Sequence, residues 1–333
     1  MILTLPLVEA VRSLWPDARI DFLVRASYVG FLEGHKGIDT AIPFDKRKLH
    51  KGLGGMLNLA RKLSAVNYDL ALIPHRSFRS GLIAAMSGIR KRVGFSKVAG
   101  SLWYTNSVPR NLEAHEGERN LALLDVFEGA RSQDWDVRPW LDLEGHPAAD
   151  EVTDWLDEAE LPRQKRIVVL APGSVWETKR WPEGHWTKLV RQIETDPTLV
   201  PVMVGGPEDR DLCIRIRDAS GGTVYNAAGQ LSVAGSAALI ARADLLITGD
   251  TAPLHLAQAV RTKTLAIFGP TVPDFGFAPT GAKDRIIGLD LPCRPCAIHG
   301  SRECPLGHHH CMLWLDAGMV WKTAQDMLAT SNT

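Results

Sequence analysis

Apolar and polar positions alternate along the first 130 residues in two patterns, short apolar runs and longer runs with a period near 3.6. The short runs predict strands, and the periodic runs predict helices with one apolar face. Regular alternation of the two indicates βαβ units and a parallel sheet. The predicted strands are 19–24, 41–44, 69–74 and 92–95, and the predicted helices are 3–15, 56–65, 80–87 and 116–128.

A second alternating series begins at residue 166, after a helix predicted at 148–160 and a break in the pattern at 161–165. We therefore predict an α/β fold with two Rossmann-like doubly wound domains, residues 1–160 and 166–315, followed by a C-terminal helix within 316–333. The predicted strands of the second series are 166–171, 199–204, 223–226, 243–248 and 264–268, and its helices are 183–192, 209–219, 233–241 and 252–260.

The chain starts with a helical pattern, and Leu3, Leu5, Leu7, Val8 and Val11 make this start strongly apolar. Such a helix normally follows a sheet strand and covers it. We therefore expect that the first strand and first turn of the N-terminal domain are missing from this sequence and that Met1 is an internal methionine.

Composition narrows the class of protein. An apolar fraction of 45% and a charged fraction of 23% are those of a soluble globular protein, and no apolar run approaches the ~20 residues of a membrane helix. Residues 1–130 hold 18 Lys and Arg against 12 Asp and Glu, with clusters at 46–51 and 90–92. This excess fits either a solvated face or an anionic partner such as phosphorylated lipid. Aromatic residues do not interleave with the clusters, so nucleic acid is disfavoured.

Three strand ends of the second series carry polar groups where open α/β sheets bind ligands. After 166–171, Gly173 permits close approach to a ligand, Ser174 offers a hydroxyl, and Lys179 and Arg180 add positive charge before a helix. A turn with a solvated basic pair is the alternative. After 199–204, Glu208 is placed to bind ribose hydroxyls; the alternative is that Glu208 and Asp209 simply cap the next helix.

After 243–248, Asp250 and Thr251 precede a helix whose first N–H groups can bind phosphate, and Thr251 is placed to cap that helix. His255 lies one helical turn further, either on the same ligand or in the core. Thr271 follows the next strand, 264–268.

Four of the five cysteines fall at Cys293, Cys296, Cys304 and Cys311, spaced C-x2-C-x7-C-x6-C. The start of the chain does not read as an export signal, so metal binding is favoured over disulfides. We expect a structural zinc that holds an irregular loop. Buried or idle thiols are the alternative.

These segments together resemble glycosyltransferase family 9, the bacterial lipopolysaccharide heptosyltransferases. The resemblance runs over nearly the whole chain and rests on segments at 172–182, 249–257 and 268–271, with further similar segments at 74–80, 91–95 and 115–121. Ala252 departs from the family's pattern, which has glycine there.

The resemblance implies a GT-B fold and an inverting glycosyltransferase that moves heptose from ADP-heptose to the inner core of lipopolysaccharide. It implies that Gly173, Ser174, Lys179, Glu208, Asp250, Thr251 and His255 bind the donor. Catalysis would need no metal cofactor. The lipid A-core acceptor would be held by the basic N-terminal half, in the cytoplasm at the inner membrane surface.

The resemblance places the general base, an aspartate, upstream of Met1, so no residue of this sequence is assigned that role. We therefore weigh two alternatives: a truncated family member that binds ADP-sugar without efficient turnover, and a sugar-nucleotide epimerase.

Overall fold

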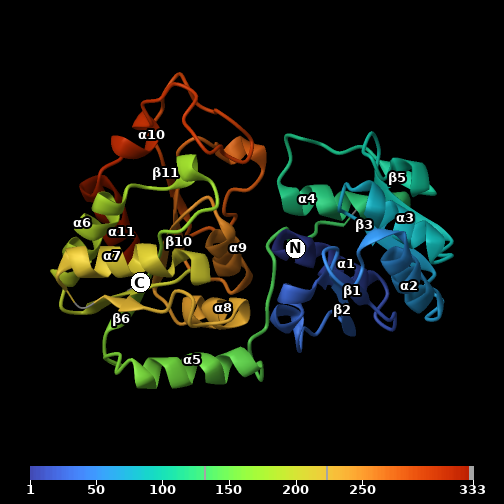
Figure 1. Cartoon of the computed structure of the whole chain (residues 1–333), viewed down its shortest axis with the longest axis horizontal. Coiled ribbons are helices and arrows are strands. Elements are labelled where there is room, and N and C mark those ends of the chain that lie inside the picture. The colour runs from blue at the N-terminus through green and yellow to red at the C-terminus, as the bar shows by residue number, and fades with distance from the viewer. Residues whose placement is uncertain (131–132, 223, 330–333) are drawn as a thin grey trace. The chain divides into compact units, whose positions relative to one another are not determined.

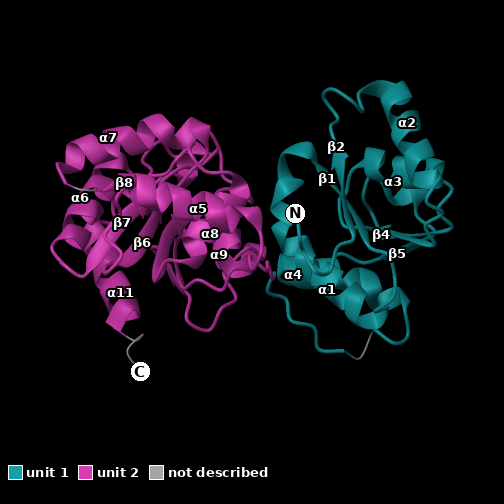
Figure 2. Ribbon diagram, turned by 90° about the horizontal axis from the view of Figure 1, so that it is seen from below, with its two compact units in different colours: residues 1–139 teal, residues 140–333 magenta. Residues whose placement is uncertain are grey.

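The computed structural model describes residues 1–130, 133–222 and 224–329, and the chain divides into two compact units. Unit 1 comprises residues 1–139 and unit 2 comprises residues 140–333 (Figure 2). Each unit is built on parallel strands with helices between them, as the sequence pattern predicts. Within the described residues, no helix combines the length and apolarity needed to cross a membrane.

Unit 2 contains one sheet of six strands, all parallel, in the order β11-β10-β9-β6-β7-β8. Numbered along the unit and read from the β8 edge, this order is 3-2-1-4-5-6, that of a Rossmann fold. The direction of strand addition reverses between β6 and β9, so their carboxyl ends flank the crevice where such sheets bind ligands. The strands are β6 (Arg166–Ala171), β7 (Leu199–Met203), β8 (Tyr225–Asn226), β9 (Leu245–Gly249), β10 (Thr264–Ile267) and β11 (Arg285–Ile287).

Helices cover both faces of this sheet, which explains why its strands are apolar without alternation. Alternate positions such as Val168 and Leu170 join the core under α6 (Glu183–Glu194), α7 (Arg210–Ser220) and α11 (Ala317–Ala329). On β10, Ala266 instead packs with Leu254 of α9 (Ala252–Ala259). Helix α8 (Val233–Ala241) contacts α9, and α10 is a single turn, His310–Leu313 (Figure 1).

Helix α5 (Pro147–Glu158) belongs to unit 2 by its contacts, although the sequence pattern placed it in the first domain. It packs against α8. Trp155 donates its indole N–H to Gln230 at 3.0 Å, and Glu151 accepts the backbone N–H and the hydroxyl of Ser232, both at 2.6 Å. The contact boundary therefore falls after Pro139 rather than at the proline-containing break at 161–165. Contacts with residues distant in sequence decide which unit α5 belongs to, and the local hydrophobic pattern carries no information on such contacts.

The strands of unit 1 form two separate parallel sheets, β1-β2 and β3-β4-β5. The expectation that a strand precedes residue 1 is untested and stays a prediction. The strands are β1 (Asp21–Arg25), β2 (Thr40–Phe44), β3 (Leu70–Ile73), β4 (Lys91–Phe95) and β5 (Asn106–Val108), and the helices are α1 (Leu5–Leu14), α2 (Gly52–Ser64), α3 (Phe78–Met86) and α4 (Glu116–Leu121).

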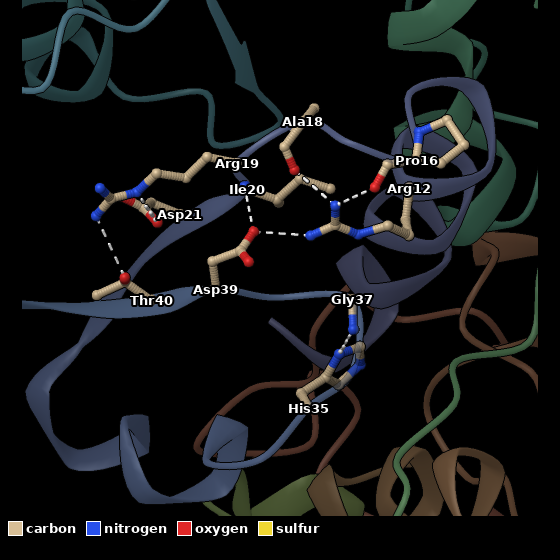
Figure 3. Close-up of polar contacts among 10 residues, drawn as sticks. All are labelled: Arg12, Pro16, Ala18, Arg19, Ile20, Asp21, His35, Gly37, Asp39 and Thr40. Carbon is tan, nitrogen blue, oxygen red and sulfur yellow. Dashed lines mark hydrogen bonds and ion pairs between the residues drawn. The ribbon is translucent and has the colours of Figure 1, made fainter.

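A polar cluster ties the end of α1 to the start of the β1-β2 sheet (Figure 3). Arg12 donates to the backbone carbonyls of Pro16 and Ala18 and to the carboxylate of Asp39 at 2.7 Å. The same carboxylate accepts the backbone N–H of Ile20 at 2.7 Å, just before β1. One side chain therefore fixes the turn that joins the first helix to the first strand.

Among the strands and α-helices of the described residues, three short ones were not predicted: β5, β11 and α10. Each has only three or four residues, too few for a periodic pattern to appear. The helix predicted at 116–128 is α-helical only to Leu121 and continues as a 3₁₀ segment, Ala122–Val126.

Candidate functional site

Three polar residues from separate turns meet at the carboxyl edge of the unit 2 sheet. Lys179 Nζ lies 2.5 Å from Asp250 Oδ2, and it also donates to the Asp250 carbonyl at 3.1 Å. Thr271 donates its hydroxyl to the same carboxylate oxygen at 2.8 Å. All three side chains are buried, at 9%, 8% and 1% exposure. A buried carboxylate with two donors is held in one position, and this fixes the turn after β9 against the turns after β6 and β10.

The turn after β9 leads into α9 without a side-chain cap, contrary to the expected capping by Thr251. Thr251 is the residue at the N-cap position, but its hydroxyl pairs with that of Thr248 at 3.2 Å. The first turn of α9 includes Pro253, which has no N–H to offer. The positive end of the α9 dipole therefore lies beside Asp250 without a side-chain oxygen on it, an arrangement that favours anions.

The turn after β6 is shaped by close packing at Gly173. A Cβ built on Gly173 would lie 2.2 Å from the carboxyl group of Asp209, and one on Gly205 would lie 2.7 Å from the Asp209 Cβ. Asp209 is held there because its carboxylate accepts the backbone N–H of Gly206 at 3.0 Å. Burial raises the pKa of this carboxyl above its ordinary value. Sequence reasoning gave Asp209 only a capping role, although the glycines at 173 and 205 signal the close approach.

The segment after Gly173 sets the position of Arg180. Arg180 donates from Nε to the Ser174 carbonyl at 2.8 Å, and the Ser174 hydroxyl accepts the backbone N–H of Trp176 at 3.2 Å. A hollow of about 770 Å³ within unit 2 adjoins this segment. Its lining includes Arg180, Trp181, Glu208, Asp209, Arg302 and His309. Of the seven residues predicted to bind the donor, Glu208 alone lines this hollow, and it shares the surface with Arg180.

His255 is half-buried on α9, and its ring lies near an aromatic side chain from the following loop. The His255 and Phe277 ring centroids are 6.4 Å apart, and those of Phe277 and His299 are 6.1 Å apart. His255 is therefore placed on the first helical turns after Asp250. Its predicted role as a donor ligand stays a prediction.

The cysteine segment packs against the same turns. Arg294 donates to the carbonyls of Phe268 and Thr271 at 3.0 and 2.9 Å, and the Cys296 N–H donates to the Pro270 carbonyl at 2.9 Å. Thr178 exchanges hydrogen bonds with Ser301, and His309 Nε2 lies 2.8 Å from the Thr178 carbonyl. The loop that carries the cysteines therefore supports both Thr271 and the residue before Lys179.

The four thiols of this loop are free, and they influence one another. Burial, with a smaller contribution from the neighbouring Cys296, raises the pKa of Cys311 to about 11. Burial also raises the pKa of Cys304, but backbone N–H donors, including His309, Leu306 and His308, outweigh it and hold that pKa below its usual value. Across the described ranges, no three His, Cys, Asp or Glu side chains converge closely enough to hold a metal ion.

In unit 1, a basic group of residues gathers near the carboxyl ends of β1 and β3. Arg25 ends β1, and His75 and Arg76 follow β3. The side chain of His75 is exposed, but the protein around it still removes part of its solvation, which lowers its pKa, and Lys46, Arg25 and Arg76 lower it further. Its Nδ1 lies 2.9 Å from the Ser80 hydroxyl.

The segment 115–121, which resembles the family, has a structural role in unit 1. His115 caps α4 by accepting the Gly117 N–H at 3.1 Å. Arg119 is buried and donates to the Asn111 carbonyl at 2.9 Å, while Asn120 donates to the Leu3 carbonyl at 2.8 Å. These contacts hold α4 against the start of the chain.

Comparison with known proteins decides the family. The model of glycosyltransferase family 9 (heptosyltransferase) matches residues 56–308, about three quarters of the chain. The chain belongs to glycosyltransferase family 9. It is therefore a transferase, and Lys179, Asp250 and Thr271 all lie inside the matched region.

Similar proteins support the same family. Lipopolysaccharide heptosyltransferase 1 of Pseudomonas aeruginosa is 29% identical over 315 residues, which cover 88% of this chain and 81% of the relative. Among solved structures, E. coli ADP-heptose LPS heptosyltransferase II matches with a TM-score of 0.82 at 22% identity, covering 100% of this chain and 96% of its own.

A family 9 glycosyltransferase from Veillonella parvula matches with a TM-score of 0.86 at 19% identity, covering 99% and 94% of the two chains. These likenesses show the fold, and the prediction of a GT-B architecture is confirmed.

Proposed function

We propose that this family 9 enzyme moves heptose from ADP-heptose to the inner core of lipopolysaccharide. The names of the related proteins support the reaction class, and the Lys179–Asp250–Thr271 cluster at the topological switch point supports the placing of the donor. The epimerase alternative is not favoured, because the family model covers segments from both units. Binding without turnover is not favoured either, and the assay below separates it from transfer.

In the proposed reaction, the acceptor hydroxyl attacks the anomeric carbon of heptose from the face opposite the diphosphate. The new C–O bond forms as the bond to the diphosphate oxygen breaks, and ADP leaves with the bonding electrons. Lys179, Arg180 and the N-terminus of α9 supply positive potential where that negative charge develops. Gly173 lets the backbone approach the diphosphate, and Glu208 accepts hydrogen bonds from the ribose.

The acceptor would be a lipid A-core saccharide, an anionic glycolipid. The basic group around Arg25, His75 and Arg76 is its proposed binding region, because phosphorylated sugars attract such a surface. The attacking hydroxyl must give its proton to a base, and no residue of this sequence is assigned that role. We propose that the enzyme works from the cytoplasm at the inner membrane.

Replacement of Lys179 tests the proposed function. With ADP-heptose and a defined core acceptor, we expect K179Q to lower kcat by about 10²–10³-fold, the usual effect of losing one electrostatic donor to a leaving group. K179R keeps the charge and should retain more activity than K179Q. Release of ADP and mass of the saccharide product report transfer directly.

Stability is the necessary control, because K179Q leaves the Asp250 carboxylate buried without its cation, at a cost of about 3–5 kcal/mol. Thermal unfolding identifies temperatures at which both variants are folded. Lys188 is an exposed lysine of α6, and K188Q should match the wild type. Transfer by K179Q at the wild-type rate would contradict the proposal, and so would ADP-heptose binding by a wild type that transfers nothing.

We also propose that Cys293, Cys296, Cys304 and Cys311 bind a structural zinc that stabilises their loop and takes no part in the reaction. Their spacing, the shared loop and the four backbone donors on Cys304 support it, since N–H···S hydrogen bonds commonly orient metal thiolates. Binding requires the sulfurs to lie closer together than they do among the described residues.

Elemental analysis tests the zinc proposal. Purified wild type should carry about one zinc per chain, and C304S/C311S should carry none and unfold at lower temperature. C213A is the matched control, because Cys213 lies apart on α7. Wild-type protein that is folded and free of metal would contradict the site.

A further inference from the structure

A second apolar stripe runs along the outer side of α2. The inner side carries Met56, Leu59 and Leu63, which pack with Ile83 of α3. The outer side carries Leu53 and Leu57, one helical turn apart and 71% and 43% exposed. The helix thus has apolar side chains on a face that soluble proteins normally make polar.

The loop before α2 adds one more exposed leucine and a dense positive charge. Leu49 is 72% exposed. Lys46, Arg47, Lys48 and Lys51 of this loop are exposed, as are Arg61 and Lys62 at the end of the helix. Residues 45–62 therefore carry six cationic side chains and one carboxylate, that of Asp45.

This loop is held in a fixed shape. The Asp45 carboxylate accepts the backbone N–H groups of Arg47 and Lys48 at 2.9 and 3.0 Å. The buried His50 closes the turn, since its Nδ1 accepts the Asp45 N–H at 3.0 Å and its ring stacks on Phe44. The turn therefore holds the exposed side chains of residues 46–49 outward from a buried anchor.

The location of this surface in unit 1 and its composition indicate what kind of partner it binds. The loop follows β2 directly, so it lies at the carboxyl edge of the β1-β2 sheet, and α2 lies at the periphery of unit 1 in both views (Figures 1 and 2). Exposed leucines flanked by lysine and arginine match an anionic bilayer, whose phosphates attract the cations while the leucines enter the headgroup region. The aliphatic stems of lysine and arginine extend that apolar contact.

We propose that Leu49, Leu53 and Leu57, with the surrounding Lys and Arg of residues 46–62, form a docking surface for the anionic face of a phospholipid bilayer. We call it the α2 docking surface. It rests on exposure and charge alone and not on the proposed reaction. It would hold the carboxyl edge of the β1-β2 sheet beside the membrane, where a glycolipid acceptor presents its saccharide.

Vesicle co-sedimentation of the full 333-residue chain tests the α2 docking surface. The wild type should bind vesicles of phosphatidylcholine with about one third phosphatidylglycerol, and bind pure phosphatidylcholine at least tenfold more weakly. Raised salt should weaken binding. L49S/L53S and K46Q/R47Q/K48Q/K51Q should each lower the partition coefficient at least tenfold.

Matched variants in unit 2 control for general effects of polarity and charge. L313S/M319S changes two exposed apolar residues, and R163Q/K188Q/R217Q/K322Q removes four exposed charges. Both should bind like the wild type, and circular dichroism should show all variants folded. The proposal is overturned if the wild type ignores anionic vesicles, or if the α2 variants bind no more weakly than their unit 2 controls.

Activity separates this proposal from the proposed function. L49S/L53S should transfer heptose to a lipid-free core saccharide at the wild-type rate, and lose activity only when the acceptor is embedded in vesicles. An inactive wild type that still binds anionic vesicles would overturn the proposed function and leave the docking surface standing.

Discussion

At the carboxyl edge of the unit 2 sheet, one buried carboxylate, that of Asp250, both pairs with a cation and joins separate turns. The Asp250 carboxylate pairs with Lys179 and also accepts the Thr271 hydroxyl hydrogen bond, so these contacts join the three turns. A pair buried this deeply gives little net stability, because desolvation of both charges offsets their attraction. Its value lies in fixing positive charge at one place in the proposed donor site.

His75 gives a prediction at the residue scale. Partial loss of solvation holds its pKa below the ordinary 6.5, so the folded chain keeps the ring neutral where the unfolded chain would be protonated. Stability should therefore fall as the pH drops below about 6.5 and stop falling below the folded pKa. In H75Q, the part of the fall in unfolding free energy between pH 7.5 and 5.5 that comes from His75 should be absent.

NMR titration of the His75 ring checks the direction of the shift, and denaturant unfolding at both pH values checks the linkage. A ring midpoint at or above 6.5 would contradict it. We expect S80A to move the midpoint as well, because Ser80 is the hydrogen-bond partner of the ring.

At the scale of elements, the turns after β6 and β7 are built around one carboxylate. Asp209 fills the space that a side chain would need at Gly173 and at Gly205, so both glycines are required by packing rather than by an unusual φ. The two turns are therefore packed against the same side chain.

Substitution of Gly173 tests this coupling. G173A should destabilise the protein by about 1–3 kcal/mol and weaken ADP binding, because the new methyl group overlaps Asp209. G173A/D209A should recover much of that stability, which a double-mutant cycle in denaturant measures.

Gly184 provides the control within the same unit. It lies in the first turn of α6 with nothing within 4 Å of a Cβ built there, so G184A should be neutral or stabilise by up to about 1 kcal/mol. Equal effects of G173A and G184A on stability would show that the overlap at Gly173 does not matter.

At the scale of the whole molecule, the proposed donor residues all fall in one unit. Unit 2, which has its own six-stranded sheet and core, contains all seven of them: Gly173, Ser174, Lys179, Glu208, Asp250, Thr251 and His255. The proposed acceptor region and the α2 docking surface belong to unit 1. The two substrates are thus assigned to different compact units.

Hydrogen exchange measured by mass spectrometry tests that division. ADP at about 100 times its Kd should stabilise unit 2 by about 2.7 kcal/mol. Protection should concentrate on residues 172–180, 205–209, 250–255 and 269–271, with unit 1 unchanged. Equal protection of β1-β2 and β9 would contradict a donor site confined to unit 2.

Local pattern in the sequence was enough to predict the longer helices and strands of unit 2, and β6 and α8 match their predicted ranges fully. It also predicted that Asp250, Thr271 and the segment before Lys179 follow strands, because apolar runs ending in polar turns are a local signal. Short elements such as β5 and β11, and the assignment of α5, depend on contacts with distant residues and left no such signal.

By itself, the sequence determined the α/β class, the resemblance to its family and the residues that stand at strand ends. Only the tertiary structure decided which strand ends are neighbours. The order β10-β9-β6 brings Lys179 onto Asp250, 71 residues away, and Thr271 onto the same oxygen. The tertiary structure also decided that Leu59 is buried and Leu57 is exposed on the same helix, α2, because burial depends on what packs against each face.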